Sequence, residues 1–260
     1  MLKPSLIYWM FSLSLLCSSF ALHSLDETTE PYLKEADINQ IFNTHVKVYY
    51  TEEYMHRYVP LPLEKNNLPW RWETKDFARI VPLLEFEKFI KTNNISSRKA
   101  LAFNGINDPE WYYITCENIV EASYLSNKDK YDLHNLQLPE SGFDFVMLNN
   151  TLEHVYDPIR CLRNIYRYMD PNGILYVEVP VNSMPHDTPW HYYTGFTPTG
   201  LGAMAVAAGF RILHIGQWGN HEYLQKMYAT KDWPDYRQFA NPGFNDLSHP
   251  ISAWIFAIKD

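Results

Sequence analysis

The fold is decided by FDFVMLNNTLEHVYDPIRCLRNIYRYMDPNGILYVEVP (residues 143–180), followed by HYYTGFTPTGLGAMAVAAGF (residues 191–210). An apolar run ends in two asparagines, an amphipathic helix follows, and a turn leads into a second apolar run. This order predicts a β-α-β unit. Ligands of open α/β sheets bind outside the carboxyl ends of the strands. We therefore expect the functional site at the corner from Asn149 to His154.

Two helices in this stretch have clear ends. The first has Asp157 as N-cap and Pro158 at its first position, and the turn 170–173 ends it. The second starts at Thr197 and ends at Gly209. Elsewhere, apolar patterns predict strands at 99–103, 111–116, 211–217 and 251–258, a short piece at 133–138 and a helix at 76–90. Together they predict an α/β, Rossmann-like fold with a mostly parallel central sheet flanked by helices.

Composition divides the chain into three segments. Residues 1–21 are predicted to be a signal peptide, because Lys3 precedes a short apolar stretch with small residues before a cleavage point at Ala21. An uncleaved anchor and a misassigned start are the alternatives. Residues 22–95 are expected to be a helical and loop extension, and residues 96–260 the α/β domain. If the signal is used, the protein enters the secretory pathway or an extracytoplasmic space; otherwise it is cytoplasmic.

The overall composition excludes several classes of function. A net charge of −8 without a basic run disfavours nucleic-acid partners. The apolar stretch near the N-terminus is shorter than the ~20 residues of a membrane span, so no stable membrane insertion is expected after signal removal. Only Cys116 and Cys161 remain beyond the signal, too few for a disulfide framework.

Four elements of the central stretch resemble the class I S-adenosylmethionine-dependent methyltransferases. They are the strand with its asparagine corner, the quartet Leu152-Glu153-His154-Val155, the Pro-Asn-Gly turn, and the helix start Phe196-Thr197-Pro198. The resemblance is to the branch with a type 11 methyltransferase domain and covers about residues 98–216. It implies an enzyme that moves a methyl group in line from S-adenosylmethionine to a small-molecule acceptor, chiefly by positioning that acceptor.

The same resemblance implies which residues hold the cofactor. Asn104 and Gly105 occupy the loop after the first strand, facing the methionine half. Glu117 would end the second strand and accept hydrogen bonds from the ribose hydroxyls. Further cofactor contacts are expected from Asp132 and Leu133 at the adenine and from Asn149 and Asn150 beside the methionine portion.

The first-strand loop departs from the family pattern. Ala102 stands where an acid is expected, and Ile106 where a second glycine would let the backbone approach the cofactor. An alternative reading is therefore a catalytically inactive, methyltransferase-like binding or interaction protein. The signal-like N-terminus favours this alternative, because the methyl donor is made in the cytosol. A nicotinamide-dependent oxidoreductase is disfavoured for want of a G-x-G-x-x-G loop.

The loop after the fifth strand carries the one candidate catalytic base, His191. His186 lies five residues earlier, but no third metal ligand is evident, so no metal site is predicted. The 219–240 segment is expected to be a surface excursion before the last strand.

Overall fold

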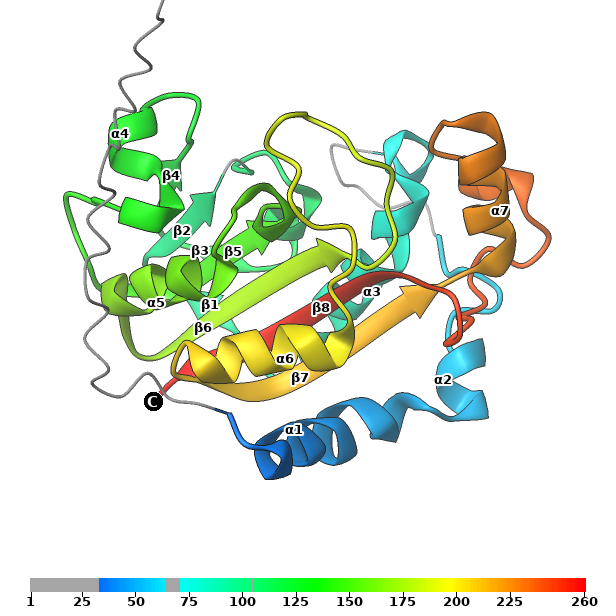
Figure 1. The fold of residues 1–260 in the computed structure, drawn as a ribbon, viewed down its shortest axis with the longest axis horizontal. Coiled ribbons are helices and arrows are strands. Elements are labelled where there is room, and N and C mark those ends of the chain that lie inside the picture. Colours follow the sequence, from blue (N-terminus) through cyan, green and yellow to red (C-terminus); the bar gives the residue numbers. More distant parts are fainter. Residues whose placement is uncertain (1–32, 64–70, 104) are drawn as a thin grey trace, which may run out of the picture. The chain divides into compact units, whose positions relative to one another are not determined.

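The computed structural model describes residues 33–63, 71–103 and 105–260 (Figure 1). The predicted signal peptide and Asn104 lie outside these residues. Residues 33–260 form one compact unit, in which the segment preceding residue 96 packs with the rest. Within the described residues, no helix combines the length and apolarity that crossing a membrane requires.

A six-stranded sheet forms the centre of this unit, in the order β4-β2-β5-β6-β8-β7. Its strands are β2 (Ala100–Phe103), β4 (Ile119–Ala122), β5 (Phe143–Asn149), β6 (Met169–Pro180), β7 (Phe210–Gly219) and β8 (Pro250–Lys259). The first four run parallel, and β8 is antiparallel to both of its neighbours. The predicted α/β, mostly parallel, Rossmann-like sheet is thereby confirmed. The carboxyl ends of β2, β4 and β5 meet at one edge.

Helices cover both faces of the sheet, because its strands are apolar on both sides. Leu101 and Phe103 point into a core shared with α1 (Glu35–Ile41), α5 (Pro158–Tyr168) and α6 (Pro198–Ala207). Ala100 and Ala102 point into the opposite core, built with α3 (Phe77–Thr92) and α7 (His221–Thr230). Figure 1 shows α5 and α6 on one side of the strands and α3 on the other.

Shorter elements connect these layers. They are the π-helix η1 (Phe42–Val46), the 3-10 helices η2 (Lys47–Tyr49), η3 (Trp72–Thr74), η4 (Pro109–Tyr112), η5 (Leu133–Asn135), η6 (Leu152–His154) and η7 (Tyr236–Gln238), the helices α2 (Glu52–His56) and α4 (Lys128–Tyr131), and the two-residue strands β1 (Ser96–Ser97) and β3 (Thr115–Cys116). The strands β1 and β3 form a separate parallel pair.

The predicted helix starts are confirmed in atomic detail. Asp157 Oδ1 accepts a hydrogen bond from the Arg160 amide at 3.1 Å, and Thr197 Oγ1 accepts one from the Gly200 amide at 3.1 Å. Both satisfy amides that a helix leaves unpaired at its start. Beyond the second helix, Gly209 has φ +103, a conformation that glycine adopts readily.

Some of the expected elements differ in the structure. Residues 111–116 are not a strand of the sheet: Pro109 begins η4, and the Trp111 indole is buried, donating to the Gly105 carbonyl at 2.7 Å. The strand that pairs with β2 is β4, so the acid near its carboxyl end is Glu121 and not Glu117. The short piece predicted at 133–138 starts as the 3-10 helix η5. The 219–240 segment contains α7, whose Tyr223 and Met227 are buried.

Candidate functional site

Two cavities open at the carboxyl ends of the parallel strands. The larger has a volume of about 690 Å³ and lies over the ends of β2, β4 and β5. The smaller, about 420 Å³, lies between α3, α7 and the ends of β6 and β8. Asn150, His154 and Asp187 line both cavities. The three shared residues therefore mark a junction, at the corner where the sequence predicted a site.

The larger cavity collects several of the predicted cofactor residues. Asp132, Leu133 and Asn150 line it. Glu121, the next-to-last residue of β4 and the register partner of Ala102 on β2, lines it too. Asp132 Oδ1 also accepts from the backbone amide of His134 at 2.9 Å, and this bond shapes the short helix η5. A volume of this size is typical of small-molecule sites.

The other predicted cofactor residues lie outside that lining. Glu117 follows β3, and its amide donates to the Ser97 carbonyl at 3.0 Å, within the small parallel pair. Gly105 and Asn149 do not belong to the residues that line the cavity. A Cβ on Gly105 would sit 2.5 Å from Asp108 Oδ2. This glycine therefore makes room for the Asp108 carboxylate, a need that the family pattern did not indicate.

A buried ion cluster lies beneath the smaller cavity. Arg79 of α3 donates to Glu110 Oε1 at 2.6 Å, and it lies 3.5 Å from Asp108 Oδ1 and 3.6 Å from Glu178 Oε2. Glu110 and Glu178 are buried. One guanidinium thus faces three carboxyl groups. Burial raises the pKa of Glu178 to about 8, partly offset by Arg79, so the cluster retains a proton at neutral pH.

Glu153 is a second buried carboxyl in the wall of the smaller cavity. It is fully buried in η6, and neither of its carboxylate oxygens has a hydrogen-bond partner among the described residues. Burial raises the pKa of this carboxyl to about 8. Its backbone carbonyl accepts hydrogen bonds from the amides of Tyr192 and Tyr193 at 2.8 and 3.3 Å. These two bonds hold the loop between β6 and α6 against η6.

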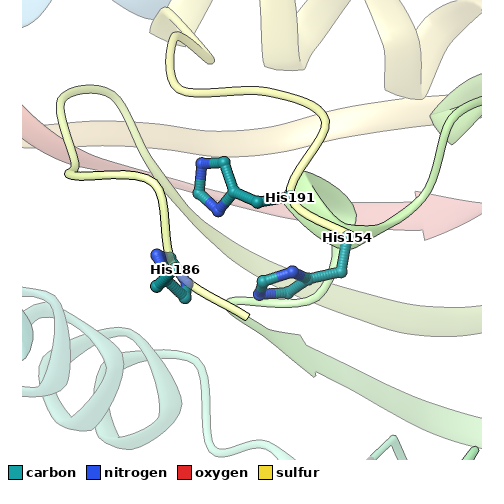
Figure 2. Close-up of side chains that lie close together, drawn as sticks. All are labelled: His154, His186 and His191. Atoms are coloured by element: carbon teal, nitrogen blue, oxygen red, sulfur yellow. The ribbon is translucent and has the colours of Figure 1, made fainter. Parts of the chain in front are cut away.

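That loop brings three histidines together. Figure 2 shows the rings of His154, His186 and His191 turned toward one shared space. His154 belongs to η6, whereas His186 and His191 belong to the loop. The ring centroids lie 4.4 to 5.5 Å apart. Burial lowers the pKa of His154 and of His191, and the imidazole of His186 lowers both further. The sequence showed His186 and His191 as a possible metal-binding pair without an evident third ligand, whereas the structure adds His154 to the pair.

The junction also holds two residues in an unusual backbone conformation. Asn150 has φ +43 and Asp187 has φ +49. Asparagine and aspartate tolerate the left-handed region better than other residues with a Cβ, and such conformations cluster at functional sites. The backbone amide of Asn150 donates a hydrogen bond to the Glu178 carbonyl at 2.9 Å, which holds the turn in place. The side chains of both residues thereby reach the two cavities.

Sequence reasoning missed most of the acidic residues of the smaller cavity. One sequence signal was available for Glu178. This acid interrupts the apolar run of β6, and an acidic residue within a buried strand is rare unless it is paired. Arg79 carries no such signal, because a single arginine on a helix is common. The candidate base His191 lies beside the junction but lines neither cavity, whereas His154 lines both.

The chain resembles known proteins in one region of its sequence and in its fold. Residues 96–215 match the family model described as a methyltransferase domain, which confirms the resemblance for that part of the chain. No functionally curated protein matches the sequence.

Solved structures with a similar fold include several methyltransferases and a cyclase. The N-methyltransferase NodS from Bradyrhizobium japonicum, in complex with S-adenosyl-L-homocysteine, is 12% identical, with 75% of this chain and 93% of that chain covered and a TM-score of 0.46. The [4+2]-cyclase SpnF is 17% identical over 68% and 81% of the two chains, with a TM-score of 0.43. Phosphoethanolamine N-methyltransferase 2 from Haemonchus contortus, in complex with S-adenosyl-L-methionine, is 13% identical over 85% and 59%, with a TM-score of 0.42.

Proposed function

We propose that this chain, whose residues 96–215 match the model of a methyltransferase domain, uses S-adenosylmethionine to methylate a small molecule bound in the smaller cavity. The observation that carries the proposal is the junction. A larger cavity at the cofactor edge of the sheet and a smaller one beside it share Asn150, His154 and Asp187. In-line transfer requires a donor and an acceptor held end to end, and two adjoining cavities supply that arrangement.

The larger cavity suits the cofactor by its chemistry. S-adenosylmethionine supplies an electrophilic methyl group on a cationic sulfonium. Glu121 would accept hydrogen bonds from its ribose hydroxyls, the role that the resemblance assigns to the acid ending the second strand. Asp132 and Leu133 would bind the adenine. The Tyr156 ring stacks on His134 at 3.8 Å and adds a flat aromatic wall to the same cavity.

The smaller cavity suits a small polar acceptor. Glu153 and Glu178 line it with carboxyl groups whose pKa values lie near 8, so at neutral pH they are largely protonated and donate hydrogen bonds. Met227, Trp233 and Ile251 line its apolar side. This combination would orient a molecule that has a polar end and an apolar body. Orientation of the acceptor is the main contribution that this chain's residues make to the transfer.

The cofactor assignment is tested by calorimetric titration of the full-length chain with S-adenosylmethionine and with its demethylated product. Glu121→Gln should weaken binding by about tenfold or more, since a carboxylate that accepts hydrogen bonds contributes about 1.5 kcal/mol or more. The matched control is Glu117→Gln, which should leave the affinity unchanged because Glu117 lies outside the cavity. Absence of heat at millimolar ligand would refute the proposal.

A second candidate function is a binding or interaction protein without catalysis. The observation that favours it is the first-strand loop, where Asp108 is hydrogen-bonded to Asn149 at 2.8 Å and lies 3.5 Å from Arg79. The loop is thus tied to the protein itself. Cofactor binding in calorimetry, without methyl transfer to any of a panel of small amines, alcohols and carboxylates, would support this function over the first.

We also infer the compartment from the N-terminal segment, which lies outside the described residues. If residues 1–21 direct export, the protein works in the secretory pathway or outside the cytoplasm. An export assay in a heterologous cell tests this inference. Full-length protein retained in the cytosol would contradict it, and a mature form starting at Leu22 would support it.

A further inference from the structure

The geometry points to a site for one divalent transition-metal ion, of the type that imidazole binds well, held by His154, His186 and His191 at the junction of the two cavities. One ligand nitrogen from each histidine lies within 4.8 Å of the others. Nitrogens bound to one tetrahedral Zn²⁺ at 2.0–2.1 Å lie about 3.4 Å apart. Small rotations of the three rings therefore bring them to binding distance, and Figure 2 shows that they already face the same space.

Hydrogen bonds at the far side of two rings favour this role. His154 Nδ1 lies 3.2 Å from the Trp190 carbonyl oxygen, and His186 Nδ1 lies 3.0 Å from that of Met184. A carbonyl oxygen only accepts, so Nδ1 of each ring donates and carries the proton. The lone pair then belongs to Nε2, which is therefore the nitrogen that each ring would offer to an ion. Metal-binding histidines are held in this way, with the second ring nitrogen bonded to a carbonyl or carboxylate.

The third ring lacks any alternative partner. Both nitrogens of His191 are buried, and neither has a hydrogen-bond partner within residues 33–63, 71–103 and 105–260. Buried ring nitrogens without partners are unfavourable, because they lose their hydrogen bonds to water. A metal ion would satisfy one of these nitrogens. This reading makes His191 a ligand instead of the proton acceptor that the sequence suggested.

The surroundings complete a site with an open position. Glu153 Oε1 lies 3.9 Å from His154 Nε2, and its two oxygens have no hydrogen-bond partner in the described part of the chain. The charge of a bound ion would favour the ionised form of Glu153, and that carboxylate would offset part of the charge. Three protein ligands with the fourth position left open characterise catalytic zinc sites, whereas structural sites fill all four. The open position would face the cavities that His154 lines.

The test is metal binding by the full-length chain, stripped with a chelator and titrated with Zn²⁺ and Co²⁺. We expect one tightly bound ion per chain and the visible absorption of four-coordinate Co²⁺. His154→Gln, His186→Gln and His191→Gln should each weaken Zn²⁺ binding by at least about a hundredfold. A chain that binds zinc but not S-adenosylmethionine would leave this inference standing while removing the proposed function.

The chain offers a matched control in a second histidine pair. His221 and His249 have ring centroids 4.4 Å apart, far along the sequence from the three ligands. His249→Gln should leave metal affinity unchanged, and thermal unfolding of each metal-free variant shows whether it folds. Equal loss of binding in the control, or full binding in all three ligand variants, would overturn the site. Absence of the Co²⁺ bands in the wild-type protein would overturn it even if a variant failed to fold.

Discussion

Asp108 and Asn149 join the chain segments that follow two neighbouring parallel strands, β2 and β5. Asn149 Nδ2 donates a hydrogen bond to Asp108 Oδ2 at 2.8 Å. The bond fastens the first-strand loop, where the glycine pattern of the family is missing, to the corner at which the two cavities meet. This side-chain contact ties the loop after β2 to the carboxyl end of β5.

The first prediction concerns this bond. Asn149→Ala should lower the free energy of unfolding by about 1–2 kcal/mol, because Asp108 loses a buried donor. Asn149→Asp should cost more at pH 8, since two ionised carboxylates would then meet at hydrogen-bond distance. Urea denaturation at pH 8 and pH 5 measures both variants. An aspartate variant as stable as wild type at pH 8 would contradict the assigned bond.

The second prediction concerns the buried ion cluster. Arg79→Ala should lower the free energy of unfolding by about 3–5 kcal/mol, because it leaves Glu110 and Glu178 buried without their cation. The control is Lys91→Ala, which removes the exposed partner of Glu87 and should change stability by less than about 0.5 kcal/mol. Equal effects in the two variants, measured by chemical denaturation, would show that the cluster is not a stabilising unit.

The third prediction is a pH dependence set by Glu178. Burial raises its folded-state pKa to about 8, against 4.5 for the free side chain, and Arg79, Asp108, Glu110 and Glu153 are the charged groups that act on it. The folded state therefore holds a proton that the unfolded state releases. This contribution to stability is complete below pH 4.5 and is lost as pH rises toward and through 8.

Glu178→Gln cannot lose that proton. Between pH 5 and 9, the melting temperature of the variant should fall less than that of the wild type. The variant should exceed the wild type by the largest margin near pH 9. Glu121→Gln, an exposed acid on β4, is the control and should follow the wild-type profile. Parallel profiles for wild type and Glu178→Gln would show that the pKa of Glu178 is not raised.

The fourth prediction tests packing in the antiparallel part of the sheet. A Cβ on Gly216 of β7 would lie 2.3 Å from the ring of Trp254 on β8, and this tryptophan is fully buried. Gly216→Ala should therefore cost about 1–3 kcal/mol or more. For Gly195→Ala the nearest atom is the Val181 carbonyl oxygen at 4.0 Å, so no loss is expected. Chemical denaturation of the two variants tests the pairing of Gly216 with Trp254 between β7 and β8. A Gly216→Ala variant as stable as the wild type would contradict this pairing.

Much of the fold could be predicted from local sequence patterns. The strands at 143–149 and 174–179 and the helix starts at Asp157 and Thr197 follow from apolar periodicity and capping residues. Apolar periodicity and capping involve residues only a few positions apart, and the folded protein keeps these local structures. The prediction of a strand at 111–116 was wrong, because apolar residues at these positions are buried without belonging to the central sheet. Trp111 and Ile114 pack into the core from a 3-10 turn and the residues after it.

Less of the candidate site than of the fold could be predicted from local sequence patterns. The family resemblance predicted Asp132, Leu133 and Asn150 as cofactor contacts, and all three line the larger cavity. Glu121 was recognised only when the sheet register showed where the second strand ends. A shift of a few residues along the chain decides which acid occupies a strand end, and periodicity does not define strand ends that closely.

The sequence by itself determined the class of fold and the corner at which to look for chemistry, because hydrophobic periodicity and helix caps are local properties of the chain. Only the tertiary structure decided the composition of the site. Arg79 reaches Glu178 across about a hundred residues, and His154 meets His186 and His191 through a loop that two hydrogen bonds to Glu153 hold in place. Contacts between residues so far apart depend on how the layers pack, and single residues in one sequence carry no record of that packing.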